Sequence, residues 1–150
     1  MKKKIVHHKS HKGHYKADAV VFWCFDTRFF QLFKKFKRSH KYRKVDLVQS
    51  TGGAKGLSSP SHRETSYLLF QIEASYKLHH VKRVVLMDHL ECGAYKGDKK
   101  FKGQKLDEAF YLNEIKKQKE IAMAFMKRKK IDIPVDIVYA DFTGLHKVKV

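Results

Sequence analysis

Two continuous apolar runs stand out in the pattern of hydrophobic and polar positions. Ala19 to Trp23 and Val84 to Met87 contain only apolar residues, many of them β-branched or aromatic. Short runs of this kind are typical of strands that are buried on both faces. Val45 to Gln49 also has the pattern of a strand, and Val135, Ile137 and Tyr139 alternate with other residues as in a strand, so we expect strands at 19–25, 45–49, 81–87 and 135–139.

Apolar residues recur at helical spacing in other segments. In the segment 26–38 this stripe consists of Phe29, Leu32, Phe33 and Phe36. The stripe is typical of a core or of a subunit interface. Ser61 to Glu64 has the pattern of a capping box that opens a helix, and Asp107 is expected to cap a helix running to about Lys129. Strands that alternate with helices predict an α/β fold, with a mostly parallel central sheet flanked by helices.

The first sixteen residues differ from the rest of the chain. Residues 1–16 are basic and histidine-rich and show no periodicity, so we expect a flexible tail. Residues 17–150 are expected to form a single domain, and a chain of this length buries about two-thirds of its unfolded surface. Within it, Lys96 to Lys105 is expected to be a polar loop. No apolar run approaches the ~20 residues of a membrane span, and no apolar segment follows the charged start, so we expect a cytoplasmic protein.

The chain carries a formal net charge of +18. One interpretation is nucleic-acid binding, since basic residues neutralise phosphates. The other is a lysine-rich solvated surface. Because the lysines are spread along the chain and no familiar nucleic-acid module is visible, we favour the second and expect at most weak, non-specific binding of nucleic acid.

Side chains that suit a metal follow both apolar runs. Cys24 follows the first run, His89 and Cys92 follow the second, and the chain has no other cysteine. Parallel strands end at one edge of a sheet, where α/β proteins bind ligands. Two thiolates and one imidazole suit zinc, and three protein ligands leave the open fourth position of a catalytic site. In a reducing compartment, two cysteines point to metal rather than to a disulfide.

The two clusters resemble the β-class carbonic anhydrases, in particular the smaller members with short N-termini. That family carries Cys-x-Asp-x-Arg after its first core strand, as at 24–28, and His-x-x-Cys-Gly after its third, as at 89–93. The resemblance covers residues 17–95 best. Gly52 and Gly53 match the family's pocket loop, whereas Gln49, Ser50 and Thr51 stand where Arg-Asn-Ala is usual.

The resemblance implies a zinc enzyme that hydrates carbon dioxide to bicarbonate by a metal-bound hydroxide. Cys24, His89 and Cys92 would hold Zn²⁺, and Asp26 and Arg28 would act beside it. Arg28 would bind the Asp26 carboxylate in a bidentate contact, whereas a plain surface ion pair would contribute little. In the family this aspartate either faces the fourth metal position or occupies it. Gly52 and Gly53 would line the substrate pocket.

Alternatives remain open at this point. Related proteins hydrolyse carbon disulfide or carbonyl sulfide with a similar site. A non-catalytic, zinc-stabilised protein that binds nucleic acid would instead require four protein ligands and no Asp26–Arg28 pair. Because the family builds its pocket beside a dimer interface, the resemblance also implies a homodimer or a higher even oligomer.

Overall fold

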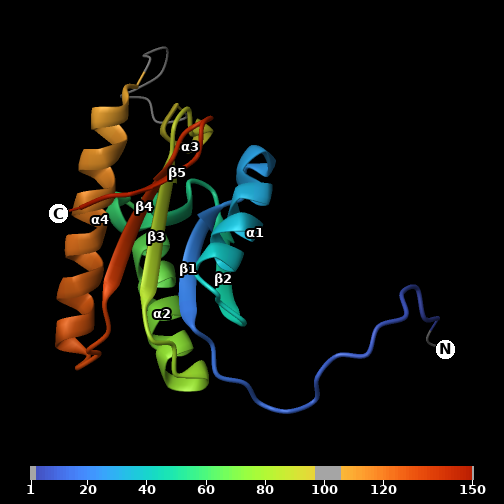
Figure 1. Cartoon of the computed structure of the whole chain (residues 1–150). Helices are drawn as coiled ribbons and strands as arrows, with labels where there is room; N and C mark the ends of the chain where they lie inside the picture. Colours follow the sequence, from blue (N-terminus) through green and yellow to red (C-terminus); the bar gives the residue numbers. More distant parts are fainter. Residues whose placement is uncertain (1–2, 97–105, 150) are drawn as a thin grey trace.

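The computed structural model describes residues 3–96 and 106–149, and within them five strands form one sheet (Figure 1). The strands are β1 (Ala19–Cys24), β2 (Val45–Ser50), β3 (Val84–His89), β4 (Val135–Ala140) and β5 (Leu145–Lys147). Their order across the sheet is β2-β1-β3-β4-β5. The first four strands are mutually parallel, and β5 runs antiparallel to β4. The predicted α/β fold with a mostly parallel sheet is confirmed.

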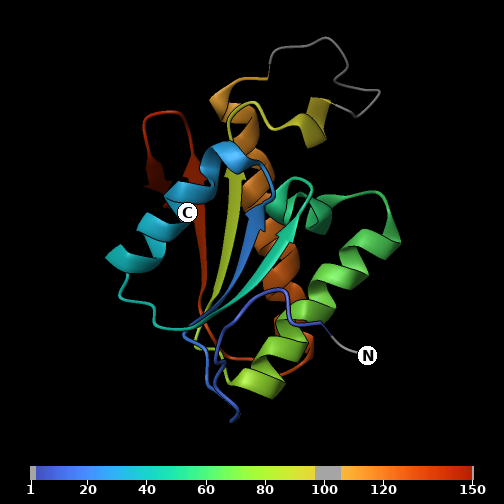
Figure 2. The same ribbon diagram turned by 90° about the vertical axis from the view of Figure 1, so that its right-hand side faces the viewer.

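Helices cover both faces of this sheet, as predicted (Figures 1 and 2). The helices are α1 (Phe30–Ser39), α2 (His62–His79), α3 (Gly93–Lys96) and α4 (Glu108–Arg128), with short 3-10 turns η1 (Thr27–Phe29) and η2 (Gly53–Ser58). Asp107 caps α4 as expected, because its carboxylate accepts a hydrogen bond of 2.9 Å from the Phe110 backbone N–H. Figure 1 shows α1 on one side of the sheet and α2 and α4 on the other.

The alternation of side chains along β1 divides the core into two layers. Val20 and Phe22 belong to the layer with Ile72 of α2 and Ile115 of α4. Val21 and Trp23 belong to the opposite layer, which contains the buried phenylalanines of α1. Both layers bury the strand completely, which is why its sequence is apolar without interruption.

The phenylalanine stripe of the segment 26–38 packs within the chain itself. Phe29, Phe33 and Phe36 are buried, and the Trp23 ring lies 5.4 Å from Phe33 and 5.9 Å from Phe36, centroid to centroid. Of the two uses predicted for the stripe, the structure therefore shows the core. The helix also starts later than predicted, because the Asp26 carboxylate first caps η1 by accepting from the Arg28 N–H.

The predicted capping box at Ser61 is wrong, although α2 does begin at the next residue. The Ser61 side chain makes no capping hydrogen bond, and its backbone N–H donates to Ser59 Oγ. Glu64, the expected partner, lines a pocket instead. The helix start is stabilised in another way, since the Thr65 hydroxyl donates to the Gly56 carbonyl at 3.0 Å.

Other boundaries differ from the sequence pattern. The third strand starts later than predicted and extends to His89, so the candidate ligand is its last residue. Helix α3 and strand β5 were not predicted, being too short for a periodic signal. The predicted polar loop lies almost wholly outside the described residues. In the described part of the predicted tail, residues 3–16 contain neither helix nor strand, and Tyr15 stacks on His79 of α2.

Candidate metal centre

The sheet topology brings the three candidate metal ligands together. Cys24 is the last residue of β1 and His89 the last residue of β3, and these neighbouring strands end at the same edge. Strands β2 and β3 lie on opposite sides of β1, so the chain changes direction across the sheet here, as at the ligand sites of other open α/β sheets. Cys92 follows three residues after His89, immediately before α3.

The ligand atoms of Cys24, His89 and Cys92 all lie within 4.8 Å of one another, and all three residues are buried. In tetrahedral zinc sites with Zn–S bonds of about 2.3 Å, the ligand atoms are roughly 4 Å apart. The cluster is therefore compatible with a metal ion. Within the described ranges it is also the sole group of three such side chains.

The hydrogen bonding of His89 leaves one ring nitrogen free. Its Nδ1 lies 2.8 Å from the Leu90 carbonyl oxygen, and since a carbonyl can only accept, Nδ1 carries the proton. Nε2 is buried and has no hydrogen-bond partner among the residues that the structure describes. A buried nitrogen with a free lone pair and a fixed tautomer is the form in which histidine binds metals.

The two thiols influence each other strongly. Interaction with the Cys92 thiol lowers the pKa of Cys24 to about 4. The pKa of Cys92 is raised, first by its hydrogen bond with Cys24 and then by burial. Burial, the largest influence, disfavours the charged form of His89, but the hydrogen bonds with Cys24 and the Leu90 carbonyl and the negative charges of Cys24 and Asp26 together outweigh it and raise the histidine pKa. Negative charge thus accumulates on Cys24, and a divalent cation would stabilise both thiolates.

Asp26 and Arg28 form the bidentate pair that the sequence predicted. Arg28 Nη2 donates to Asp26 Oδ2 at 2.7 Å, and Nε donates to both carboxylate oxygens at 3.0 Å. These hydrogen bonds lower the pKa of Asp26, so its carboxylate is ionised at neutral pH. Arg28 also reaches the chain beside Cys92, because Nη2 donates to the Glu91 carbonyl at 3.3 Å and Nη1 lies 3.8 Å from the Glu91 carboxylate.

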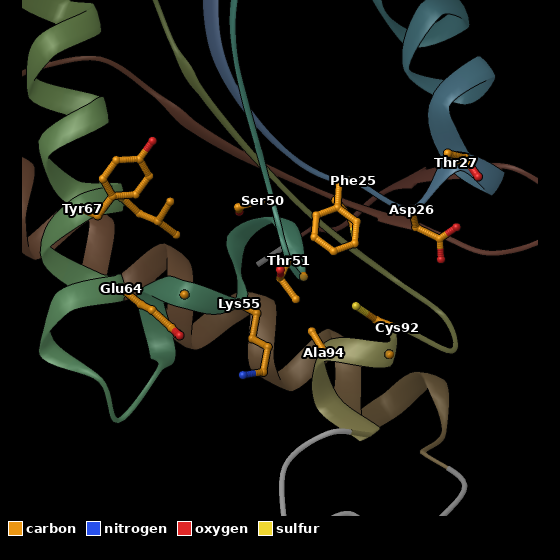
Figure 3. A pocket seen from close by; sticks show the side chains of 15 residues that line it. Phe25, Asp26, Thr27, Ser50, Thr51, Lys55, Glu64, Tyr67, Cys92 and Ala94 are labelled. Atoms are coloured by element: carbon orange, nitrogen blue, oxygen red, sulfur yellow. The ribbon is translucent and has the colours of Figure 1, made fainter.

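A pocket of about 940 Å³ opens beside the cluster. Figure 3 shows Cys92, Asp26 and Phe25 along one side of it and Glu64 and Tyr67 of α2 along the other. The remaining lining side chains include Ser50 of β2, Thr51 of the turn that follows it, Lys55 of η2 and Ala94 of α3. Both cysteines and Asp26 therefore face a space that is large enough for a small molecule.

Of the glycine pair, Gly52 lines the pocket, and Gly53 packs against the backbone of β1 and β3. Gly53 has φ of +60°, and a Cβ atom there would lie 2.6 Å from the Met87 carbonyl oxygen and 3.0 Å from the Cys24 nitrogen. No side chain fits between the ends of β1 and β3 at this distance. Gly52 lines the pocket, also with positive φ, and a Cβ atom there would lie 2.9 Å from the Ala94 Cβ.

Sequence reasoning missed a buried polar group next to the cluster. Gln118 of α4 donates to Asp88 Oδ2 at 3.0 Å and to the Tyr95 hydroxyl at 2.9 Å, and Tyr95 donates to Asp88 at 2.8 Å. All three residues are buried. Burial raises the pKa of Asp88 to about 7 against these hydrogen bonds. A signal was present, because the glutamine falls on the apolar stripe of α4, where a polar residue needs a partner.

One family model matches most of the chain. Residues 15–137 match a family model described as "Putative carbonic anhydrase". No curated protein matches the chain in sequence.

Solved structures of β-carbonic anhydrases are similar in fold. Isoform I from Trichomonas vaginalis is 15% identical, with a TM-score of 0.59 over 94% of this chain and 87% of that one. The carbonic anhydrase from Streptococcus mutans is 14% identical, with a TM-score of 0.56 over 95% and 89%. A β-carbonic anhydrase from Sordaria macrospora, described as tetrameric, is 12% identical, with a TM-score of 0.52 over 92% and 83%.

Proposed function

The chain belongs to this carbonic anhydrase family, and on that premise we propose that it hydrates carbon dioxide to bicarbonate with the help of zinc. The convergence of Cys24, His89 and Cys92 at the edge of an open pocket carries the proposal. Three buried ligands beside a solvent-connected space correspond to a catalytic zinc site rather than to a closed structural one.

We assign the metal to these three side chains because thiolates and imidazole are preferred zinc ligands. When bound there, zinc lowers the pKa of a coordinated water, so that hydroxide becomes available to attack a small electrophilic carbon. We place the protein in the cytoplasm, where a reducing environment keeps both thiols free for metal. Within the described residues, no helix is of a length and apolarity that would allow it to cross a membrane.

Asp26 is proposed to orient the attacking oxygen. Its carboxylate is ionised and can accept a hydrogen bond, and it lines the same pocket as both cysteines. Arg28 engages both oxygens of this carboxylate and so directs it. With the pair formed, the carboxylate would be held on Arg28 and would leave the fourth position of a bound metal free.

The pocket walls suit a small apolar substrate and an anionic product. Phe25 and Leu68 contribute apolar surface for carbon dioxide, and Gly52 leaves the backbone accessible. Lys55 lines the same pocket, and its positive charge favours bicarbonate.

The decisive measurement is the rate of carbon dioxide hydration by the zinc-loaded protein in a stopped-flow pH-indicator assay. We expect catalysis well above the buffer rate, and none in the Cys92→Ala variant carried through the same purification. A zinc-loaded wild-type protein that is no faster than buffer would disprove the proposal.

A second candidate is the hydrolysis of carbon disulfide or carbonyl sulfide. It is favoured by the size of the pocket and by the apolar side chains of Phe25, Tyr67 and Leu68, which suit molecules that are larger and more polarisable than carbon dioxide. The same preparation should be tested for sulfide release from both compounds. Sulfide release in the absence of carbon dioxide hydration would make this the primary function.

We also propose that the chain assembles as a homodimer or a higher even oligomer. Phe25 and Tyr67, at the edge of the pocket, are large side chains that are 58% and 57% exposed. A partner subunit would cover them. The tetrameric β-carbonic anhydrase from Sordaria macrospora gives a precedent for assembly on this fold.

A further inference from the structure

The turn between β4 and β5 lies against the Asp26–Arg28 pair, on which the proposed function depends. Asp141 fixes this turn, since its Oδ1 accepts from the backbone N–H groups of Thr143 at 2.7 Å and Gly144 at 2.8 Å. Its Oδ2 accepts from His146 Nε2 at 3.0 Å. The rigid turn presents Phe142, whose side chain is 57% exposed although it is large and apolar.

Phe142 contacts the guanidinium group of Arg28. The Arg28 Cζ lies 5.4 Å from the centre of the Phe142 ring and 5.7 Å from the centre of the Phe29 ring. The two rings are stacked, with centroids 5.8 Å apart. Phe29 is buried and its ring lies 4.4 Å from that of His89. A continuous aromatic surface therefore extends from the candidate metal ligand to the exposed turn.

The contacts of Arg28 divide into two kinds. Its N–H groups donate to Asp26 and Glu91, whereas its cationic carbon lies over the two aromatic rings. Because 46% of the Arg28 side chain is exposed, water competes for its donors. Cation–π contacts add an attraction that does not use these donors.

A hollow of about 240 Å³ lies beside this arrangement, lined by Arg28, Lys35, Asp141 and Phe142 among others. Without the Phe142 ring, the hollow would be larger and Arg28 could turn into it toward the Asp141 carboxylate. Asp26 would then lose the bidentate hydrogen bonds from Arg28 that hold its carboxylate beside the candidate metal ligands.

We propose that Phe142 is a positioning residue, which keeps the Arg28 guanidinium on Asp26 and thereby keeps the fourth metal position open to external ligands. This inference rests on the metal site of the proposed function. It assigns a role at that site to a turn that lies more than a hundred residues from Arg28 in sequence.

The test measures anion binding to the cobalt-substituted protein, whose visible spectrum changes when thiocyanate occupies the open position. We expect Phe142→Ala to weaken thiocyanate binding about three- to tenfold, in line with the loss of one partly exposed cation–π contact. Phe142→Leu, which keeps apolar bulk without the ring, should show the same loss. Phe142→Tyr retains the ring and should bind within about twofold of the wild type. Phe70→Ala, an aromatic of similar exposure on α2, serves as the matched control and should not change binding.

A double-mutant cycle separates positioning from general structural damage. In an Arg28→Ala background, Phe142→Ala should have no further effect on thiocyanate affinity, because the group on which it acts is gone. Equal losses in both backgrounds, or wild-type affinity in Phe142→Ala, would overturn the inference.

The same experiment distinguishes this inference from the proposed function. A wild-type protein that binds thiocyanate but does not hydrate carbon dioxide contradicts only the function, and the cycle still decides the role of Phe142. A wild-type protein that binds cobalt but no thiocyanate overturns both proposals.

Discussion

At the scale of single residues, the candidate metal centre depends on which nitrogen, sulfur and oxygen atoms already have hydrogen-bond partners within the protein. His89 donates its Nδ1 proton to the Leu90 carbonyl, which leaves Nε2 free. Cys24 carries a lowered pKa because of its neighbour Cys92. Arg28 donates hydrogen bonds to the Asp26 carboxylate and so holds it away from the two cysteine sulfur atoms. Cys24 is thus already biased toward the thiolate that a divalent cation requires, whereas binding the cation would release the proton that Cys92 holds.

We predict about one zinc ion per chain in purified protein, measured by inductively coupled plasma mass spectrometry. Cys24→Ala, His89→Ala and Cys92→Ala should each lose it, because two remaining ligands bind zinc weakly. His62→Ala, at an exposed histidine outside the cluster, is the control and should retain the metal. Full retention in any two of the three site variants would contradict the assignment.

Activity is predicted to rise into the alkaline range with an apparent pKa above 7. Two thiolates cancel the charge of the zinc ion, so a coordinated water is harder to deprotonate than the value of about 7 for a three-histidine site. The ionised Asp26 adds like-charge repulsion. A hydration rate already maximal at pH 6 would show that this account of the electrostatics is wrong.

Arg28→Ala should lower the activity about 10- to 100-fold, the usual effect of removing a group that orients a metal site. The loss follows because the freed carboxylate of Asp26 can occupy the open position. Lys35→Ala, a cation in the neighbouring hollow with no contact to Asp26, is the matched control in the same assay. Equal rates for Arg28→Ala and wild type would exclude a role for the pair.

At the scale of secondary-structure elements, a buried polar network joins the parts that carry the ligands. Asp88 lies in β3 directly before His89, Tyr95 lies in α3 just after Cys92, and Gln118 lies in α4. Their three mutual hydrogen bonds connect strand, short helix and long helix in the interior. The network therefore holds β3 and α3, and with them His89 and Cys92, in fixed positions relative to each other.

This network should make stability depend on pH. The Asp88 pKa is raised from its ordinary value of 3.8 to about 7, so the folded state binds more protons than the unfolded state between these values. Stability should then fall as the pH rises from about 4 to about 7. In urea unfolding of the zinc-saturated protein at pH 5 and pH 8, Asp88→Asn should show a smaller fall than wild type, and the exposed Asp132→Asn should match wild type. The same fall in all three proteins would refute this.

At the scale of the whole molecule, the exposed apolar side chains and the net charge influence how the protein associates with other molecules. Large apolar side chains stand exposed at the pocket edge, at Phe25 and Tyr67. Basic residues are spread over the chain and give it a net charge of +18. The first feature favours self-association, whereas the second favours a well-solvated surface.

We predict an even oligomer in sedimentation velocity at micromolar concentration, because a partner subunit would bury the apolar pocket edge. The sedimentation coefficient should fall toward the monomer value only on strong dilution. A monomer at micromolar concentration would contradict this expectation.

Binding of nucleic acid is predicted to be weak and independent of sequence. In fluorescence anisotropy with single- and double-stranded oligonucleotides, the affinity should fall steeply with salt, since counterion release alone drives it. A salt-resistant complex that selects one sequence would instead favour nucleic-acid binding as the main function.

The sequence by itself determined the class of fold and the candidate ligands. Continuous apolar runs specify strands that are buried on both faces, and helical periodicity specifies the elements that cover them. Thiolate and imidazole side chains that follow two such strands indicate zinc, because these are the ligand types that zinc prefers. Parallel strands end at the same edge of a sheet, where such side chains can meet. These inferences need only local patterns, which a single sequence contains.

Only the tertiary structure decided which distant residues surround the site. The order of the strands placed Cys24 beside His89, and close packing at Gly53 required a residue without a side chain. Phe142 reached Arg28, and Gln118 reached Asp88, across separations that no local pattern encodes. Such contacts arise from the packing of elements on one another, which depends on the entire chain and leaves no periodic trace in any one segment.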